Sequence, residues 1–317
     1  MSFSSEVKNE ISRITPEKRC CMTAELAGLL RSAGSIRPEG EGRLGVSLST
    51  SYPFVARHMK RILSEATREN PMVYTTKAPG RYTKNRYEVR LDSSDAAMSL
   101  LRETGIVTQE DGLARIGTAI DPSLTHTKCC RKSLVAGFFL GSGTVTNPER
   151  GYHFEISVRD DVLAGDLRRV LGAFTDIKAQ VVRRGDKFVV YIKQAEQIRD
   201  MLGIMGAHAS LLKFEESRMM RELRGQANRL SNLDGANIGR LVASVKKQIA
   251  AAESLLGNPS AASGAPPRAR EAAKLRIRYP EASLNELAKL FDPPVSKSTA
   301  YKRLREMEAQ ASIPQSE

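Results

Sequence analysis

Two segments of the chain share one pattern of apolar and small residues. Residues 20–36 read CCMTAELAGLLRSAGSI and align without a gap with residues 129–145, CCRKSLVAGFFLGSGTV, at an offset of 109. Each segment predicts a short apolar helix that has small residues on one face and ends at Gly34 or Gly143. Small residues let two helix backbones approach closely. The pattern therefore predicts an internal duplication whose two helices pack against each other.

The elements after each copy follow the same order. After the first copy, alternating apolar residues predict a strand at 44–48, and later patterns predict a helix at 51–66, strands at 72–76 and 85–91, and a helix at 93–104. After the second copy, the same reasoning gives a strand at 153–158, a helix at 159–172, strands at 177–183 and 187–193, and a helix at 194–205. We predict an α+β fold for residues 1–205, in which an αββαββα unit occurs twice around a pseudo-twofold axis, with repeats at about 14–106 and 123–205.

The pattern becomes wholly helical from about residue 206. We expect a basic connecting segment over 206–256, a linker of small residues and prolines over 257–267, an all-α domain over 268–310 and a disordered tail over 311–317. In the all-α domain, Ser283 and Glu286 have the spacing of a capping box, and Ser296 can cap the last helix. Three short helices, the last of them basic, are typical of a helix-turn-helix whose last helix enters the major groove of DNA.

Charge and composition narrow the function. Forty-nine Lys and Arg residues against 36 Asp and Glu give a net charge of +13, which favours a polyanionic partner such as double-stranded DNA. The opposing interpretation is a solvated basic surface. No apolar run is long enough to cross a membrane, and the first 14 residues lack the apolar core of a signal peptide. We therefore expect a cytoplasmic, nucleoid-associated protein without contact with a membrane.

The four cysteines form two vicinal pairs, Cys20-Cys21 and Cys129-Cys130. Neighbours on a helix project about 100° apart, so neither pair alone makes a zinc clamp. We interpret all four as small apolar residues of a reduced protein. No metal and no cofactor are expected.

The segments LAGLLRSAG (26–34) and VAGFFLGSG (135–143) resemble the two LAGLIDADG motifs of homing endonucleases. This resemblance implies two motif helices at a pseudo-twofold axis, two curved sheets that form a saddle over DNA, and an acidic residue at the end of each motif that binds catalytic magnesium. Here Ala33 and Ser142 stand at those two positions, and neither can be an anionic ligand. We interpret the nearby Glu25, Asp160 and Asp161 as helix-cap and surface carboxylates. The domain is therefore expected to be a catalytically dead scaffold and the protein not an enzyme.

A wider resemblance covers nearly the whole chain. The two degenerate motifs, the segment ANRLSNLDGAN (227–237) and the terminal EASLNELAKLFDPPVSKSTAYKRLREM (281–307) are together similar to the sporulation-regulator WhiA family. The resemblance implies a sequence-specific transcriptional regulator, linked to sporulation, cell division and chromosome segregation, whose terminal helix-turn-helix is the main reader of DNA. It leaves room for another transcription factor as a partner. A protein-interaction scaffold with incidental DNA contact and a metal-dependent endonuclease remain as alternatives.

The candidate DNA-binding residues fall into three groups. In the helix-turn-helix, the residues near the start of the last helix are expected at base edges, and the later arginines at phosphates; the set is Ser283, Ser296, Lys297, Ser298, Thr299, Tyr301, Lys302, Arg303 and Arg305. The connecting segment adds Asn228, Arg229, Asn232, Asn237, Lys246 and Lys247. The two predicted strand hairpins add Arg81, Lys84, Arg86, Arg183, Arg184 and Lys187.

Overall fold

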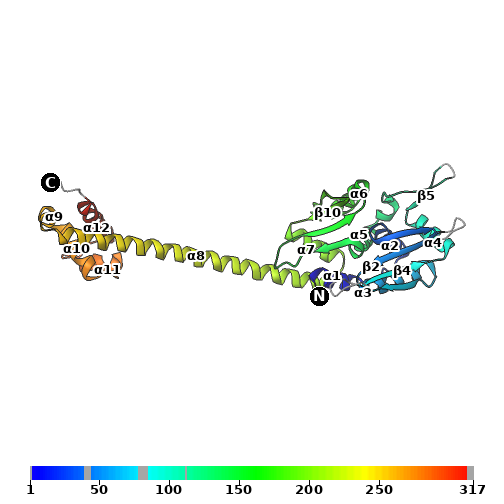
Figure 1. The fold of residues 1–317 in the computed structure, drawn as a ribbon, viewed down its shortest axis with the longest axis horizontal. Helices are drawn as coiled ribbons and strands as arrows, with labels where there is room; N and C mark the ends of the chain where they lie inside the picture. Colours follow the sequence, from blue (N-terminus) through cyan, green and yellow to red (C-terminus); the bar gives the residue numbers. More distant parts are fainter. Residues whose placement is uncertain (1, 39–43, 78–84, 111–112, 313–317) are drawn as a thin grey trace. The chain divides into compact units, whose positions relative to one another are not determined.

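The computed structural model describes residues 2–38, 44–77, 85–110 and 113–312 (Figure 1). The chain divides into two compact units, Met1–Glu222 and Leu223–Glu317. Each unit has its own hydrophobic core. The division falls inside the predicted connecting segment, 206–256.

The first half of the N-terminal unit is built around a four-stranded antiparallel sheet. Its elements are α2 (Arg19–Ala33), β1 (Gly34–Pro38), β2 (Leu44–Thr50), α3 (Pro53–Thr67), β3 (Met72–Thr76), β4 (Arg86–Leu91) and α4 (Ser94–Glu103). The strand order is β1-β2-β4-β3. Side chains alternate between the two faces of the sheet, and one face is buried: Val46 and Leu48 lie on the same side as Val89 and Leu91.

The second half repeats this arrangement. It comprises α5 (Lys128–Ser142), β7 (Gly143–Val145), β8 (Phe154–Val158), α6 (Asp161–Gly172), β9 (Gln180–Arg184), β10 (Lys187–Ile192) and α7 (Ala195–Ile204). The strand order, β7-β8-β10-β9, is that of the first sheet shifted by one repeat. The expected duplicated αββαββα fold is therefore confirmed.

The two halves meet where α2 and α5 lie side by side (Figure 1). The crossing takes place at one glycine from each motif. A Cβ atom added to Gly28 would collide with the carbonyl oxygen of Leu134 and lie 2.8 Å from the backbone nitrogen of Phe138. A Cβ atom added to Gly137 would collide with the carbonyl oxygen of Glu25. Because both obstacles are backbone atoms, neither can rotate away, and only glycine allows this approach.

Four elements of the N-terminal unit go beyond the predicted repeat. They are α1 (Phe3–Ile11), the antiparallel pair β5 (Val107–Glu110) and β6 (Leu113–Ile116), and a 3-10 turn, η1 (Pro122–Thr125). The side chain of Arg31 holds the connection between the halves, because its guanidinium donates to the carbonyl oxygens of Thr104 and Ala119, both at 2.9 Å. Burial lowers the pKa of Arg31 to about 10, which still leaves it charged at neutral pH.

Helix α8 (His208–Gly257) begins in the N-terminal unit and ends in the C-terminal one. Near its start, Phe214 is fully buried against the rings of Phe3 and Tyr152. Near its end, Ala252 and Leu255 belong to the core of the C-terminal unit. Every residue from 226 to 244 is exposed.

The C-terminal unit adds α9 (Pro259–Gly264), α10 (Pro267–Arg278), α11 (Leu284–Leu290) and α12 (Lys297–Ala311). Its core consists of small and apolar side chains from all of these helices except α9, among them Ala269, Ala272, Leu287, Phe291, Leu304 and Met307. The segment expected to be a linker, 257–267, differs from the prediction. Asn258 caps α9 through its side-chain oxygen, and Ala265 is buried, so this segment is packed against the unit. Of the expected tail, residues 313–317 lie outside the described residues.

Among the helices of the described segments, none combines the length and apolar composition that crossing a membrane requires.

The glycine contact yields a stability prediction. Gly28→Ala and Gly137→Ala should each lower the free energy of unfolding of the N-terminal unit by about 3 kcal/mol or more, because the added methyl group forces two backbones apart. Gly165→Ala in α6 is the matched control, since nothing lies within 4 Å of its added Cβ atom. It should be neutral or stabilising by up to about 1 kcal/mol. Calorimetric unfolding of the full chain measures both effects, and equal shifts for all three variants would contradict the prediction.

Candidate nucleic-acid interface

The ends of the two motif helices lie where a LAGLIDADG nuclease would carry its metal ligands. Helix α2 ends at Ala33, whose methyl group packs against the core, and α5 ends at Ser142. The hydroxyl of Ser142 donates to the carbonyl oxygen of Ser157 at 2.6 Å, so it serves the local backbone. Neither motif end offers an anionic oxygen to a divalent cation.

A groove of about 500 Å³ opens beside Ala33. Three cations line it, namely Lys8 from α1, Arg86 from β4 and Arg159 from the turn before α6. The remaining described lining residues are hydroxyl-bearing or small, and none of them has a carboxylate. Lys8 and Arg159 are also bound to backbone carbonyls, of Leu140 at 3.1 Å and of Gly34 at 3.3 Å. A groove lined in this way suits a phosphate and repels a metal ion. Lys8 and Arg159 were not among the sequence candidates, because nothing local marks them as neighbours of the motif ends.

The interpretation of Glu25 as a surface carboxylate is wrong. Glu25 is 4% exposed, and its Oε1 atom lies 2.5 Å from Nε2 of His58, which is also buried. Arg61 approaches the other ring nitrogen of His58 at 3.0 Å. Glu25 is on the side of α2 that packs against α3, and the sequence could not show this long-range pairing. Asp160, by contrast, caps α6 by accepting from the backbone N–H of Leu163 at 2.8 Å, as expected of a helix cap.

The open face of the first sheet carries cations that are already paired. The guanidinium of Arg90 donates to Glu88 at 2.9 Å and lies 4.2 Å from the centre of the Tyr74 ring. This hydrogen bond lowers the pKa of Glu88, so the carboxylate stays ionised. Arg86 is exposed and donates to the hydroxyl of Ser49 at 3.2 Å. The candidates Arg81 and Lys84 lie outside the described residues.

The second sheet has a related arrangement. On the inner strand β8, the carboxylate of Glu155 lies 3.2 Å from the guanidinium of Arg184 and 2.9 Å from Nε2 of His153. Arg183 and Lys187 are exposed next to the turn between β9 and β10. Both sheets therefore present one carboxylate paired with an arginine, and exposed arginine and lysine side chains lie toward the hairpin ends.

The caps of the helix-turn-helix have the expected form. Ser283 and Glu286 make a complete capping box at the start of α11. Ser296 caps α12 by accepting from the N–H of Thr299, and its hydroxyl also lies 2.9 Å from those of Ser298 and Thr299. The side chains of Ser283 and Ser296 therefore first serve to fix the two helix starts.

Helix α12 separates a buried face from an exposed one. Ala300, Leu304 and Met307 are buried in the core. The opposite stripe, at a spacing of three or four residues, is exposed and carries Lys297, Ser298, Tyr301, Lys302 and Arg305. The Arg305 guanidinium lies 5.8 Å from the centre of the Tyr301 ring. Five of the nine helix-turn-helix candidates thus share one outward face.

Arg303 lies elsewhere on the helix. Its guanidinium donates to Glu271 of α10 at 3.1 Å and stacks 4.8 Å from the centre of the Phe291 ring. Glu271 in turn accepts from the backbone N–H of Asp292 at 3.0 Å. Arg303 therefore joins α10, α12 and the turn after α11. The sequence could not distinguish it from the exposed basic residues next to it.

The candidates on α8 are all exposed, namely Asn228, Arg229, Asn232, Asn237, Lys246 and Lys247. The stretch 226–244 is exposed on every side, so exposure alone does not single out its four asparagine and arginine candidates. Lys247 lies 3.7 Å from Glu308 of α12. This contact brings the last turns of α8 next to the helix-turn-helix.

A duplicated LAGLIDADG-like unit without its motif carboxylates, followed by a helix-turn-helix, defines the class of protein. Three family models match consecutive parts of the chain: the WhiA N-terminal LAGLIDADG-like domain at residues 19–107, the WhiA LAGLIDADG-like domain at 131–224 and the WhiA C-terminal HTH domain at 227–311. The chain belongs to the WhiA family, as the resemblance in the sequence implied.

Curated relatives match over almost their whole length. The probable cell division protein WhiA of Clostridium novyi is 34% identical over 308 residues, which cover 97% of this chain and 96% of the relative. The probable cell division protein WhiA of Heliobacterium modesticaldum is 36% identical over 313 residues, 98% and 96% of the two chains. The crystal structure of full-length DUF199/WhiA from Thermotoga maritima has the same fold, with a TM-score of 0.58 at 23% identity over 98% of both chains.

The two arginines of α12 should differ in their effect on stability. Arg303→Ala removes the ion pair with Glu271 and the stacking on Phe291, so we expect it to lower the free energy of unfolding of the C-terminal unit by about 1–2 kcal/mol. Arg305→Ala removes an ion pair in which the arginine side chain is exposed and Glu308 keeps Lys247 as a second partner, together with an exposed contact with the Tyr301 ring. It should change the free energy of unfolding by less than about 0.5 kcal/mol. Thermal unfolding followed by circular dichroism compares them. An equal loss in both variants would show that the Arg303 contacts add nothing.

Proposed function

We propose that this protein is a sequence-specific DNA-binding transcriptional regulator whose LAGLIDADG-like unit is a non-catalytic scaffold. The observation that carries the proposal is the exposed stripe of α12, the last helix of the helix-turn-helix. Three cations and a tyrosine lie on the first three turns of this stripe, namely Lys297, Tyr301, Lys302 and Arg305. Its partner is double-stranded DNA, which places its action at the nucleoid. The relatives are named probable cell division proteins, and family resemblance adds sporulation and chromosome segregation as the processes regulated.

The stripe assigns roles by position. Lys297, Ser298 and Tyr301 lie in the first turns of α12, where a recognition helix contacts base edges. Lys302, which the sequence grouped with the base-edge candidates, directly follows Tyr301, and Arg305 lies one turn beyond Tyr301. We assign both to the phosphates, which contribute affinity but no sequence information. Thr299 is shared between the cap at Ser296 and DNA. Arg303 positions the helix from its inner side.

The non-catalytic assignment rests on the groove at the motif ends. Hydrolysis of a phosphodiester by this class needs a divalent ion beside the attacking and leaving oxygens. Ala33 and Ser142 provide no charge to hold it, and Lys8, Arg86 and Arg159 make the groove electropositive. The same cations favour a bound phosphate, so this groove and the exposed Arg183, Arg184 and Lys187 give the scaffold a means of adding DNA affinity. We propose contact with another transcription factor as a further use of this unit.

Selection of genomic fragments by the full chain tests the DNA reading. We expect the wild-type protein to retain fragments that share a motif. Lys302→Ala and Arg305→Ala should weaken binding to all DNA and each reduce the salt slope by about 1, because each removes one phosphate contact. Lys297→Ala and Tyr301→Ala should reduce discrimination against mismatched sites by about 1–3 kcal/mol for each lost base contact.

Arg102→Ala is the charge-matched control, since it removes one exposed cation from α4, which carries none of the proposed contacts. Its affinity and salt slope should equal those of the wild type. Unchanged binding in all four α12 variants would overturn the assignment of this helix as the DNA reader.

A cleavage assay tests the scaffold assignment separately. The full chain, incubated with the selected DNA and Mg²⁺ or Mn²⁺, should leave every strand intact. The double variant Ala33→Asp with Ser142→Asp should also fail to cut, because the new carboxylates would face the groove cations and Ser142 would lose its bond to Ser157. Sequencing of new DNA ends provides the measurement. Ends clustered at one site with the wild-type protein would show that other carboxylates hold a catalytic metal.

A further inference from the structure

The four cysteines of the chain come together at the starts of the two motif helices. Cys20 and Cys21 occupy the second and third positions of α2, and Cys129 and Cys130 occupy the same positions of α5. The sulfur atoms of Cys20, Cys21 and Cys130 all lie within 4.8 Å of one another. The side chain of Cys129 is close enough to Cys21 to interact with it. The interpretation of the cysteines as separate apolar residues is therefore insufficient, because the helix crossing unites two pairs that are 109 residues apart.

The cluster combines buried and accessible sulfur atoms. Cys21 and Cys130 are buried, with 5% and 3% of their surface exposed, and all four thiols are free. Cys20 is exposed and Cys129 half-buried. An ion can therefore enter past Cys20 and reach the two buried sulfur atoms.

Both cysteine pairs lie in the first turn of their helices. The positive end of a helix dipole lies there, and it stabilises negative charge. The hydroxyl of Thr127 lies 3.1 Å from the sulfur atom of Cys129 and caps α5 by accepting from the backbone N–H of Cys130 at 3.2 Å.

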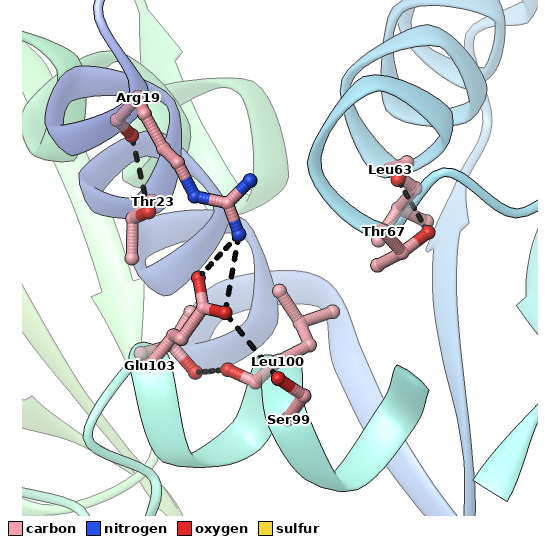
Figure 2. Close-up of polar contacts among 8 residues, drawn as sticks. Arg19, Thr23, Leu63, Thr67, Ser99, Leu100 and Glu103 are labelled. Carbon is pink, nitrogen blue, oxygen red and sulfur yellow. Dashed lines mark hydrogen bonds and ion pairs between the residues drawn. The ribbon is translucent and has the colours of Figure 1, made fainter. Parts of the chain in front are cut away.

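The first turn of α2 is held in place independently of the cluster. Figure 2 shows the guanidinium of Arg19, the residue before Cys20, donating to both carboxylate oxygens of Glu103 at the end of α4, at 3.2 and 3.1 Å. Ser99 donates to the same carboxylate at 3.3 Å. The charge of Arg19 is thereby neutralised by Glu103. The four sulfur atoms are thus presented by two anchored helix starts, without a carboxylate among the ligands.

We propose that Cys20, Cys21 and Cys130, with Cys129 as the fourth ligand, bind one thiophilic divalent cation of the Zn²⁺ type at the pseudo-twofold axis. In a tetrahedral site with Zn–S bonds of about 2.3 Å, the sulfur atoms are about 3.8 Å apart, so the observed spacing needs only a small contraction. Each thiol that binds transfers its proton to solvent, and no oxidant or reductant takes part. The bound ion would link the first turns of α2 and α5 and so stabilise the contact between the two halves.

Cobalt provides a direct spectroscopic test. The full chain is reduced, freed of metal and titrated anaerobically with Co²⁺ alone at pH 7.5. We expect one equivalent to bind, with an ultraviolet sulfur-to-cobalt charge-transfer band and the visible bands of tetrahedral Co²⁺, and Zn²⁺ to abolish both. Cys20→Ser is the main variant, because its exposed side chain can change without disturbing the core. It should weaken binding by roughly 100-fold or more, since it removes one direct ligand.

Two further measurements keep the proposal falsifiable. Zn²⁺ should raise the melting temperature of the wild-type protein and leave that of the folded Cys20→Ser variant unchanged. Ser99→Ala is the control, because it removes the hydrogen bond to Glu103 and changes no sulfur atom. This variant should bind Co²⁺ as tightly as the wild type. A folded wild-type chain without a charge-transfer band, or equal binding by Cys20→Ser, would overturn the metal site. Loss of two hydrogens in air, seen by mass spectrometry in a chain with no metal affinity, would instead identify a redox pair.

Discussion

The close approach of α2 and α5 is the constraint on which the N-terminal unit depends. Gly28 and Gly137 let the two helices touch through their backbones, so the position of each sheet relative to the other is set by a contact that admits no side chain. The same crossing determines what gathers at each end of the helix pair. Beside their carboxyl ends lies the groove lined by Lys8, Arg86 and Arg159, and their amino ends bring three sulfur atoms within 4.8 Å of one another. One packing contact thus creates two chemically different surroundings.

The polar positions of the motifs have changed their use. Arg31 lies inside the first motif, yet its guanidinium donates hydrogen bonds to backbone carbonyls of the segment that joins the halves. The hydroxyl of Ser142 donates to a backbone carbonyl of β8. In a LAGLIDADG nuclease, the position of Ser142 carries a carboxylate that binds the catalytic metal ion. Here Arg31 and Ser142 stabilise the fold, and the cations near the motif ends make that region electropositive.

Local patterns were sufficient for most of the fold, because alternating and helical periodicities and the caps at Ser283, Ser296 and Asp160 are encoded within a few residues. The pair β5 and β6 was missed, since its strands are short and the repeat offered no counterpart. Contacts between distant segments were also out of reach. The pairing of Glu25 with His58, of Arg303 with Glu271 and of the two cysteine pairs each joins residues more than 30 positions apart. The exposed stripe of α12 could be predicted, because one helix carries all of it.

The fully exposed part of α8, residues 226–244, determines where the chain unfolds locally. From residue 226 to 244 the helix has no core to support it, and Gly235 and Gly239 each cost about 1 kcal/mol relative to alanine in a helix. A helix that depends on its own hydrogen bonds alone is marginal in water. Its amide hydrogens therefore exchange with solvent sooner than those of α2 or α12, and a protease meets an unravelled chain there first. Cleavage at that place would release two pieces, each of which keeps the core that folds it.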